Sequence, residues 1–439
     1  MSSSPNIGLE TLKSYLFTHV RTKHIEFQII DYGSTPRCRV VPLARALQIA
    51  ETGKTDGVST TSPILYAGAP FEIATYGANP GEDHWVADWT TLKPVAGKPR
   101  HAWVACSVKE CVEGSESYLT DPRTILRRVE ESSQKAGIEF QIGYEVEYIL
   151  STTGSANPLD IPPTWLCSAA LRHPSFSIVE ESVDHLEEEA DIPIWQFHQE
   201  GPSMFEIPLS PSTPLLAVDN LAFTHETIKT IASKHEMHAS FHPNAFESGP
   251  PVGQHIHLSL SRPEEGDHFL AGLLEHLPAL TAFTNGGYDS GGRQNQYGSG
   301  NVVWGTTKLL PVRRIGEAHY ELRFPDTLTN PYLQLAAVLI AGMDGVNKQM
   351  ELTITPSDWI DVVSFKPMPQ EKREELGVTK SLPENLEESL KALKEDSEVF
   401  RKGLGEKSFD TYVEYREREF KGAQMTTIAQ RRKIMITNI

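Results

Sequence analysis

The stretch GYEVEYIL at residues 143–150 places two carboxylates inside a segment that otherwise has the pattern of a buried strand. Because successive side chains of a strand point to opposite faces, Glu145 and Glu147 share one face, and the aromatic and aliphatic residues take the other. Two like charges at this spacing repel each other unless a positive group lies between them. A divalent cation is the simplest such group. For a single Glu-x-Glu, a half-exposed strand with its polar face in water is the commoner case, but three further stretches favour the cation.

A second strand pattern, GQHIHLSL, carries two histidines on one face. His255, His257 and Ser259 alternate with isoleucine and leucine, so the imidazoles share a face while the aliphatic side chains pack on the other. Imidazole is a ligand for divalent ions and a hydrogen-bond donor to phosphate oxygens. A single histidine is more often satisfied by carbonyl groups in a core, but two on one face make that explanation less attractive.

Two more stretches add acids and a cation. The segment FHQEGPSMFEI contains a glycine and proline bend that brings Glu200 and Glu206 near each other. The segment HYELRFPD has a strand face that offers Glu321 and Arg323. A carboxylate suits a metal ion, and a guanidinium grips a carboxylate or phosphate as a two-pronged fork. A plain ion pair is the alternative for this last pair.

The composition sets the class of protein. The chain has 439 residues, which is more than one core usually holds, so we expect two domains. A formal net charge of −18 argues against nucleic acid and anionic membranes as partners. No apolar run reaches the length of a membrane span and the N-terminus has no signal pattern, so we expect a cytoplasmic location. The four cysteines form no C-x-x-C pair, which suits a reducing compartment; they are Cys38, Cys106, Cys111 and Cys167.

Periodicity predicts helices and strands on both sides of a domain boundary near residue 110. The expected helices cover residues 9–20, 42–50, 122–136, 219–235, 330–342, 386–393 and 409–420, and the expected strands 25–31, 38–41, 85–92, 103–108 and 237–241. Residues 51–82 have the composition of a long loop. The acidic run at residues 187–189 is typical of a solvated helix face, and residues 381–384 have the pattern of a capping box.

The order of these stretches resembles the glutamine synthetase family. Five motifs occur in the family's order: the Glu-x-Glu strand, the His-x-Glu and Phe-Glu-Ile bend, Gly-x-His-x-His-x-Ser-Leu, Glu-x-Arg-Phe-Pro-Asp, and Asn-Pro-Tyr-Leu with Ala-Gly-Met-Asp-Gly. The similarity runs from about residue 20 to 422, with weaker matches at residues 87–92 and 304–306. Each motif alone is weak, but five in order are specific. The nearest kind is the shorter, fungal-type glutamine synthetase-like protein of secondary metabolism.

The resemblance implies an α+β fold of two domains. Residues 1–110 would form a small β-grasp N-terminal domain, and residues 111–439 a larger catalytic domain. In the catalytic domain, a curved antiparallel sheet surrounded by helices forms a funnel for two or three divalent ions, Mg²⁺ or Mn²⁺. The resemblance also implies self-association into rings, from octamers to dodecamers, in which the N-terminal domain of one subunit completes the site of its neighbour.

Carried over position by position, the resemblance implies roles for individual residues. One ion would be held by Glu147 and Glu206 with Glu200 as a third acid, and the second by Glu145, His255 and Glu321. Such oxygen-rich sites suit magnesium or manganese. His257 and Ser259 would lie near the nucleotide phosphates. Arg323 would lie near the carboxylate or phosphate of the substrate. Because the family's nucleotide arginine is missing, we expect Lys308, Arg314 and Arg323 to act as the catalytic cations and Arg313 to bind the nucleotide.

The metal-binding and glutamate-binding stretches depart from the family pattern. The loop between Glu200 and Glu206 is one residue short, so Gln199 is an alternative to Glu200 as the ligand. The family's Asn-Gly-Ser-Gly, which holds glutamate, reads Pro-Pro-Val-Gly at residues 250–253. The arginine of its Ser-Tyr-x-Arg motif is replaced by Ser290. Glutamate is therefore not the expected substrate.

The nucleotide and ammonium positions also differ. Where the family has Asn-Arg after Trp-Gly, the chain has Thr307-Lys308-Leu309, so only Lys308 supplies charge there. Neither residues 67–71 nor the loop around Tyr297 offers the acids that deprotonate ammonium.

These patterns lead to one leading hypothesis and two alternatives. The leading hypothesis is an ATP- and Mg²⁺/Mn²⁺-dependent ligase that joins a small carboxylate to an amine through an acyl phosphate. The first alternative, favoured by the missing nucleotide arginine, is a metal-dependent enzyme on the same fold that performs hydrolysis, isomerisation or rearrangement without ATP. The second is an inactive ring-forming scaffold. That scaffold predicts loss of the metal ligands, whereas buried carboxylates are costly to retain without cations.

Overall fold

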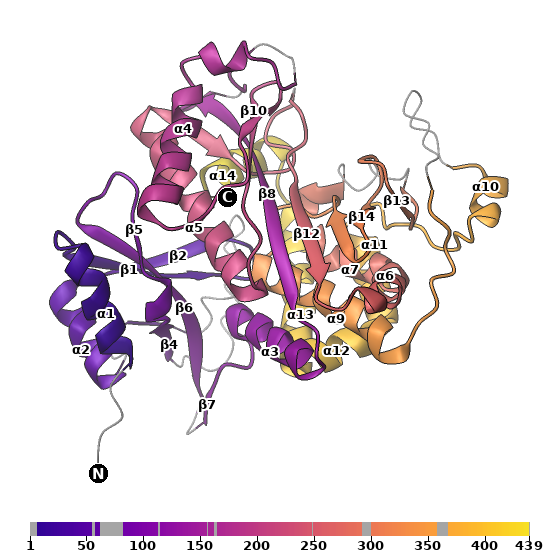
Figure 1. Ribbon diagram of the computed structural model, residues 1–439, viewed down its shortest axis with the longest axis horizontal. Coiled ribbons are helices and arrows are strands. Elements are labelled where there is room, and N and C mark those ends of the chain that lie inside the picture. The colour runs from indigo at the N-terminus through magenta and orange to yellow at the C-terminus, as the bar shows by residue number, and fades with distance from the viewer. Residues whose placement is uncertain are drawn as a thin grey trace.

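The computed structural model describes residues 7–54, 58–61, 82–112, 115–155, 157–161, 165–247, 249–291, 300–357 and 368–438. A smaller N-terminal part, indigo and purple in Figure 1, contains one sheet, and a larger part contains a second sheet and most of the helices. This is the α+β arrangement that the resemblance implied. The long loop expected at residues 51–82 lies mostly outside the described residues.

Among the described residues, seven strands form the N-terminal sheet: β1 (His24–Ile30), β2 (Pro36–Pro42), β3 (Ser59–Thr61), β4 (Glu82–Ala87), β5 (Lys93–Pro94), β6 (His101–Val112) and β7 (Ser115–Ser117). Their order is β2-β1-β6-β4-β3, with β5 and β7 also paired to β6. β1 and β2 form the expected antiparallel hairpin, while β1 runs parallel to β6. Helices α1 (Ile7–Thr18) and α2 (Leu43–Thr52) lie beside this sheet (Figure 1). Ile25, Phe27 and Ile29 alternate along β1 and are buried, which explains why this segment forms a strand.

The second sheet has eight strands in the part of the chain that the structure describes: β8 (Phe140–Thr152), β9 (His198–Gly201), β10 (Met204–Pro208), β11 (Met237–Ser240), β12 (Gln254–Leu260), β13 (Trp304–Gly305), β14 (Val312–Gly316) and β15 (His319–Leu322). The order is β13-β14-β15-β12-β8-β10-β9, with β11 also paired to β8. β13 and β14 are parallel, and the other pairs are antiparallel. The long strand β8 therefore lies in the middle, between β12 and β10.

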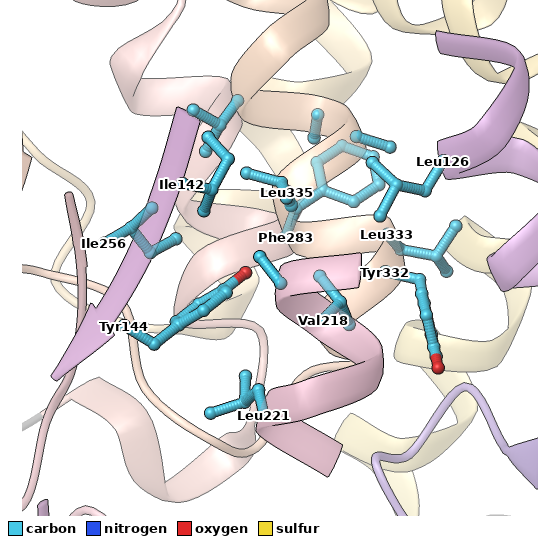
Figure 2. Packing of buried hydrophobic residues seen from close by; sticks show 14 of the residues in the cluster. Leu126, Ile142, Tyr144, Val218, Leu221, Ile256, Phe283, Tyr332, Leu333 and Leu335 are labelled. Carbon is cyan, nitrogen blue, oxygen red and sulfur yellow. The ribbon is translucent and has the colours of Figure 1, made fainter. Parts of the chain in front are cut away.

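The α-helices described in the larger part are α3 (Pro122–Lys135), α4 (Phe176–Asp184), α5 (Pro214–Lys234), α6 (Gly266–Glu275), α7 (Leu277–Thr284), α9 (Pro331–Lys348), α10 (Gln370–Glu375), α11 (Leu386–Glu395), α12 (Ser397–Leu404), α13 (Glu406–Gln424) and α14 (Ile428–Asn438). Some of them, including α5 and α9, cover one face of the second sheet. Figure 2 shows Ile142 and Tyr144 of β8 directed toward Val218 of α5 and Leu333 of α9. Because strand residues alternate, Glu145 is directed to the opposite face of β8.

Two helix N-termini test the capping predictions. The side chain of Asn330 accepts hydrogen bonds from the backbone N–H groups of Tyr332 and Leu333, so the expected cap of α9 is confirmed. The capping box expected at residues 381–384 is wrong. Asn385 caps α11 by accepting from the Glu388 N–H, because the helix begins one turn later than the Ser-x-x-Glu pattern suggested.

Buried charge pairs tie the two parts of the chain together. Arg123 of α3, which is buried, lies 2.7 Å from the carboxylate of Asp219 and 2.9 Å from that of Asp88 in the N-terminal part. The Asn330 side chain also donates to the carbonyl groups of Ile30 and Asp31. β6 ends at Val112 and α3 begins at Pro122, and the boundary between residues 110 and 111 stays a prediction.

Two surface expectations can be compared with the structure. The acidic side chains at residues 187–189 are exposed, as expected for a solvated face. None of the helices within the described ranges is long and apolar enough to cross a membrane.

Candidate functional site

The face of the second sheet opposite the helices carries a row of acids and histidines. Strand register creates it: His255 on β12 pairs with Glu145 on β8, and Glu206 on β10 pairs with Glu147 on β8. Paired residues in neighbouring strands point to the same face, so side chains from three strands converge. Glu321 of β15 joins the row through its pairing with His257.

Glu145 lies at the centre of this cluster. Its carboxylate accepts hydrogen bonds from both histidines, with His255 Nδ1 at 2.7 Å and His257 Nε2 at 3.0 Å. Burial by itself raises the pKa of Glu145, but the hydrogen bonds from the two imidazoles hold that pKa well below its usual value. The carboxylate is therefore ionised and directed at both histidines.

The pKa of Glu206 is shifted in the opposite direction from that of Glu145. It is buried, and its pKa is raised to about 10 by burial and by the negative charges of Glu145, Glu147 and Glu200. The charge of the exposed Lys308 acts against this rise. A carboxyl group crowded by other carboxylates binds either a proton or a cation.

The β9–β10 hairpin decides which residue completes the acidic group. β9 places His198 and Glu200 on the face of Glu206, with His198 Nε2 2.9 Å from Glu200 Oε2. Gln199 pairs with Phe205 on the other face and is buried, with its amide donating to the Gly201 carbonyl. Of the two alternatives, Glu200 therefore faces the cluster and Gln199 does not.

Three sets of side chains in the described part of the chain have the donor atoms for a metal ion, each set within 4.8 Å. The sets are Glu145, Glu206 and His255; Glu145, His257 and Glu321; and His198, Glu200 and Glu206. Carboxylate oxygen with imidazole nitrogen is a donor set that suits divalent cations. All the expected ligands except Glu147 belong to at least one set.

Glu147 lies beside these sets. One of its oxygens accepts a hydrogen bond from the Gly253 N–H, and the other lies 3.6 Å from His255 Nδ1. The residue is buried, so this carboxylate lies next to the first set and away from solvent.

Two cations neutralise Glu321 at the end of the row. Arg313 Nη1 lies 2.9 Å from one oxygen, and Arg323 donates to the other. Although burial raises the pKa of Glu321, the charge of Arg323 and that of His255 hold it below its usual value. The two guanidinium groups place positive charge next to the carboxylates.

Arg314, expected to act with these cations, is not brought into the cluster. It follows Arg313 directly in β14, so it projects from the other face of the strand. There Arg314 Nη1 lies 2.7 Å from Asp267, and the guanidinium lies over the ring of Trp304. The prediction of a catalytic role for Arg314 therefore disagrees with its position.

The remaining expected residues lie along β12. His257, expected near the phosphates, is in hydrogen-bond contact with Glu145 and 3.3 Å from His319 Nε2. Ser259 pairs with His319 in the neighbouring strand and is half-buried at the far end of the row. His198 and His319 were not among the predicted site residues. Strand alternation was the available signal for both, because each lies two residues from a predicted acid.

The segments that replace the family's substrate-binding residues have other contacts. The Gly253 N–H is used by Glu147, and Pro250 and Pro251 have no N–H to donate. Next to Ser290, the carboxylate of Asp289 is bound by Arg431 of α14. The acid-poor segments at residues 67–71 and around Tyr297 lie outside the described residues.

Comparisons with known proteins give a consistent result. A family model described as the catalytic domain of glutamine synthetase matches residues 119–434. The chain is 30% identical to Protein fluG of Emericella nidulans over 441 residues, which covers 97% of this chain and 50% of that protein. The chain thus spans about half the length of this relative. It is 27% identical to the glutamine synthetase of Pyrococcus abyssi over 419 residues, covering 91% of this chain and 90% of that enzyme.

Solved structures share the fold. GmaS without ligand matches with a TM-score of 0.79 at 23% identity, covering 96% of this chain and 98% of that chain. A structure described as a novel glutamine synthase homolog matches with a TM-score of 0.75 at 22% identity, covering 93% and 96%.

Proposed function

Because this chain belongs to the glutamine synthetase family, we propose that it is an ATP- and divalent-metal-dependent ligase that joins a carboxylate to an amine other than the pair of glutamate and ammonia. The observation that carries the proposal is the cluster on β8, β10, β12 and β15, where three potential ligand sets lie next to two guanidinium groups. A reaction that transfers a phosphoryl group needs this combination of metal ligands and fixed cations.

The described residues fit a divalent ion. Glu206 is 5% exposed and its neighbours Glu145, Glu147 and Glu200 are all acidic, so a cation relieves their mutual repulsion. Bound here, Mg²⁺ or Mn²⁺ supplies Lewis-acid neutralisation of phosphate charge. The number of ions is proposed as two or three, in line with the three overlapping ligand sets.

Each nearby cation has a proposed role toward the substrates. Arg313 and Arg323 lie on opposite oxygens of Glu321 at the end of the cluster, and their guanidinium charge is proposed to attract phosphate or carboxylate. Lys308 is exposed, and its charge reaches Glu206 from the solvent side. His257 and Ser259, which lie further along the same strand face, are proposed to contact the nucleotide phosphates.

The proposed chemistry has two steps. The substrate carboxylate attacks the terminal phosphorus of ATP, which forms an acyl phosphate and releases ADP. The amine then attacks the acyl carbon, the C–O bond to phosphate breaks, and inorganic phosphate and one proton leave. The substrates are not glutamate and ammonia, because two prolines and Ser290 stand where the family has its glutamate-binding residues. A structure entitled GmaS/ADP complex, with a TM-score of 0.79 to this chain, supports a nucleotide on this fold.

Calorimetric titration with a non-hydrolysable ATP analogue tests the proposal directly. With Mg²⁺ or Mn²⁺ present we expect micromolar binding, about −8 kcal/mol, and with a chelator we expect none. ADP release in the presence of mixed carboxylates and amines then identifies the substrates. Metal binding without nucleotide binding would refute ATP-dependent ligation.

A metal-dependent enzyme that does not use ATP is the second candidate. The position of Arg314 favours it, because this guanidinium is directed away from the cluster and leaves fewer cations for a triphosphate. In that case the same ligand sets would polarise a substrate for hydrolysis, isomerisation or rearrangement. The calorimetric titration separates the two candidates.

We also propose that the chain acts in the cytoplasm as a ring of identical subunits. The family membership supports this proposal. Light scattering of the purified protein gives the number of subunits.

A further inference from the structure

His198 adds a nitrogen donor to a group of ligands that the sequence suggested was made of acids alone. It lies on β9, directly opposite Glu206 in the strand register. Its Nε2 atom is 2.9 Å from Glu200 Oε2 and 3.6 Å from Glu206 Oε1. Since the imidazole is half-buried and held between two carboxylates, it is already positioned toward a common point.

The Glu206 carboxylate provides an independent reason for an ion at this place. It is 5% exposed, and His198 Nε2 lies 3.6 Å from its Oε1, which is beyond hydrogen-bond distance. Leaving a buried carboxylate without a hydrogen bond costs free energy. A cation between His198, Glu200 and Glu206 removes this cost without moving a strand.

We propose that His198, Glu200 and Glu206 form a mixed nitrogen and oxygen site, and that His198 makes this site prefer a transition-metal ion such as Mn²⁺ over Mg²⁺. This inference rests on the proposed metal-dependent function. It goes beyond that function by naming the residue that determines which ion is preferred. Imidazole binds first-row transition metals well, whereas Mg²⁺ strongly prefers oxygen ligands. The His198 site shares Glu206 with the set that contains His255, so the two sites are coupled.

Two substitutions of His198 distinguish the effect of its nitrogen donor on metal binding from the effect of the shape of the site. His198→Gln removes the imidazole and leaves a neutral amide, whereas His198→Glu replaces it with a third carboxylate. His235→Gln is the matched control: His235 Nε2 also lies 2.8 Å from a carboxylate, that of Glu181, but this pair lies outside the three ligand sets. Circular dichroism and a melting curve establish that each variant is folded.

The experiment is a titration of the full chain with Mn²⁺ and with Mg²⁺, followed by calorimetry and by electron paramagnetic resonance of the bound manganese. We expect His198→Gln to weaken one class of Mn²⁺ sites by roughly tenfold or more. We expect His198→Glu to retain that class while its preference shifts toward Mg²⁺ by about the same factor. A pulsed resonance measurement should lose one nitrogen coupling in both variants, and His235→Gln should match the unmodified protein.

Unchanged Mn²⁺ binding and unchanged nitrogen couplings in His198→Gln would overturn the inference, as would an Mg²⁺ preference that stays the same in His198→Glu. Failure of the proposed function has a different signature. In that case the unmodified protein would bind Mn²⁺ at the His198 site but would not bind the ATP analogue.

Discussion

Arg313 and Arg314 are adjacent in the chain, yet their guanidinium groups project from opposite faces of β14. The first lies 2.9 Å from Glu321 in the acidic cluster, and the second lies 2.7 Å from Asp267 on α6. The effect of a positive charge inside the cluster can therefore be compared with that of a positive charge on the opposite face of the same strand.

Arg313→Gln should weaken binding of an ATP analogue, because it removes a cation from the end of the cluster that we propose binds phosphate. We expect a loss of roughly tenfold in affinity, about 1.4 kcal/mol, measured by calorimetry with Mg²⁺. Arg314→Gln should leave the affinity unchanged. Equal losses in the two variants would contradict the assignment of faces.

Glu145→Gln should reduce metal binding more than loss of any single ligand that belongs to one set. Glu145 belongs to two of the three ligand sets, and its two oxygens accept from His255 and His257. A glutamine has only one acceptor oxygen and no charge, so it cannot replace the carboxylate at both histidines. Equilibrium dialysis with Mn²⁺ should show fewer bound ions per chain.

The control for this measurement is Glu264→Gln, because Glu264 is exposed and pairs only locally with Arg262. It should bind the same number of ions as the unmodified protein. If Glu145→Gln binds the same number of ions as the unmodified protein, the ions bind outside this cluster.

The sequence was sufficient to predict which faces of the strands carry the cluster. Alternation placed Glu145 with Glu147 and His255 with His257, and the strands of the structure confirm both pairs of faces. This works because one face of the sheet is buried against helices, so that a shift of one residue would expose the core.

What alternation could not give was the pairing of strands that are distant in sequence. The choice between Gln199 and Glu200 depended on the register of β9 against β10, which a β-bulge interrupts. The position of Arg314 followed from alternation, but only once β14 was recognised as a strand. The buried pair of Arg123 and Asp219 joins residues 96 positions apart and has no local signal.

Arg123→Met should strongly destabilise the fold. The substitution leaves Asp219 buried with a negative charge and only the Tyr332 hydroxyl as a donor among the contacts described. Breaking a buried ion pair from one side typically costs about 3–5 kcal/mol. Denaturation in urea should show this loss as a lower midpoint.

Arg127→Met is the control for that experiment, since Arg127 pairs with Asp88 but is partly exposed. Its loss should cost less than about 1 kcal/mol. The double variant Arg123→Met with Asp219→Asn should recover part of the stability, and no recovery would argue against an uncompensated charge as the cause.

His276 should make stability depend on pH. Its imidazole titrates, and it joins three helical segments through its contacts with two carboxylates. The imidazole is 4% exposed, with Nδ1 2.6 Å from Asp396, which precedes α12, and Nε2 3.0 Å from Asp344 of α9. Lys348 also lies here, 2.8 Å from Asp344, and the negative charge of Glu398 acts on it together with that of Asp396. Burial alone lowers the pKa of His276, but the hydrogen bonds with Asp396 and Asp344 outweigh it and raise the pKa above its usual value.

The sign of the effect follows from this raised pKa. The folded state binds the proton more tightly than the unfolded chain, so the stabilisation is fully present below about pH 6.5 and is lost as pH rises through the folded pKa. His276→Gln should therefore lower the melting temperature at pH 6 and have a smaller effect at pH 9. His235→Gln, which changes an exposed pair, should show little difference between the two pH values. If His276→Gln lowers the melting temperature equally at pH 6 and pH 9, the imidazole acts through packing and not through its charge.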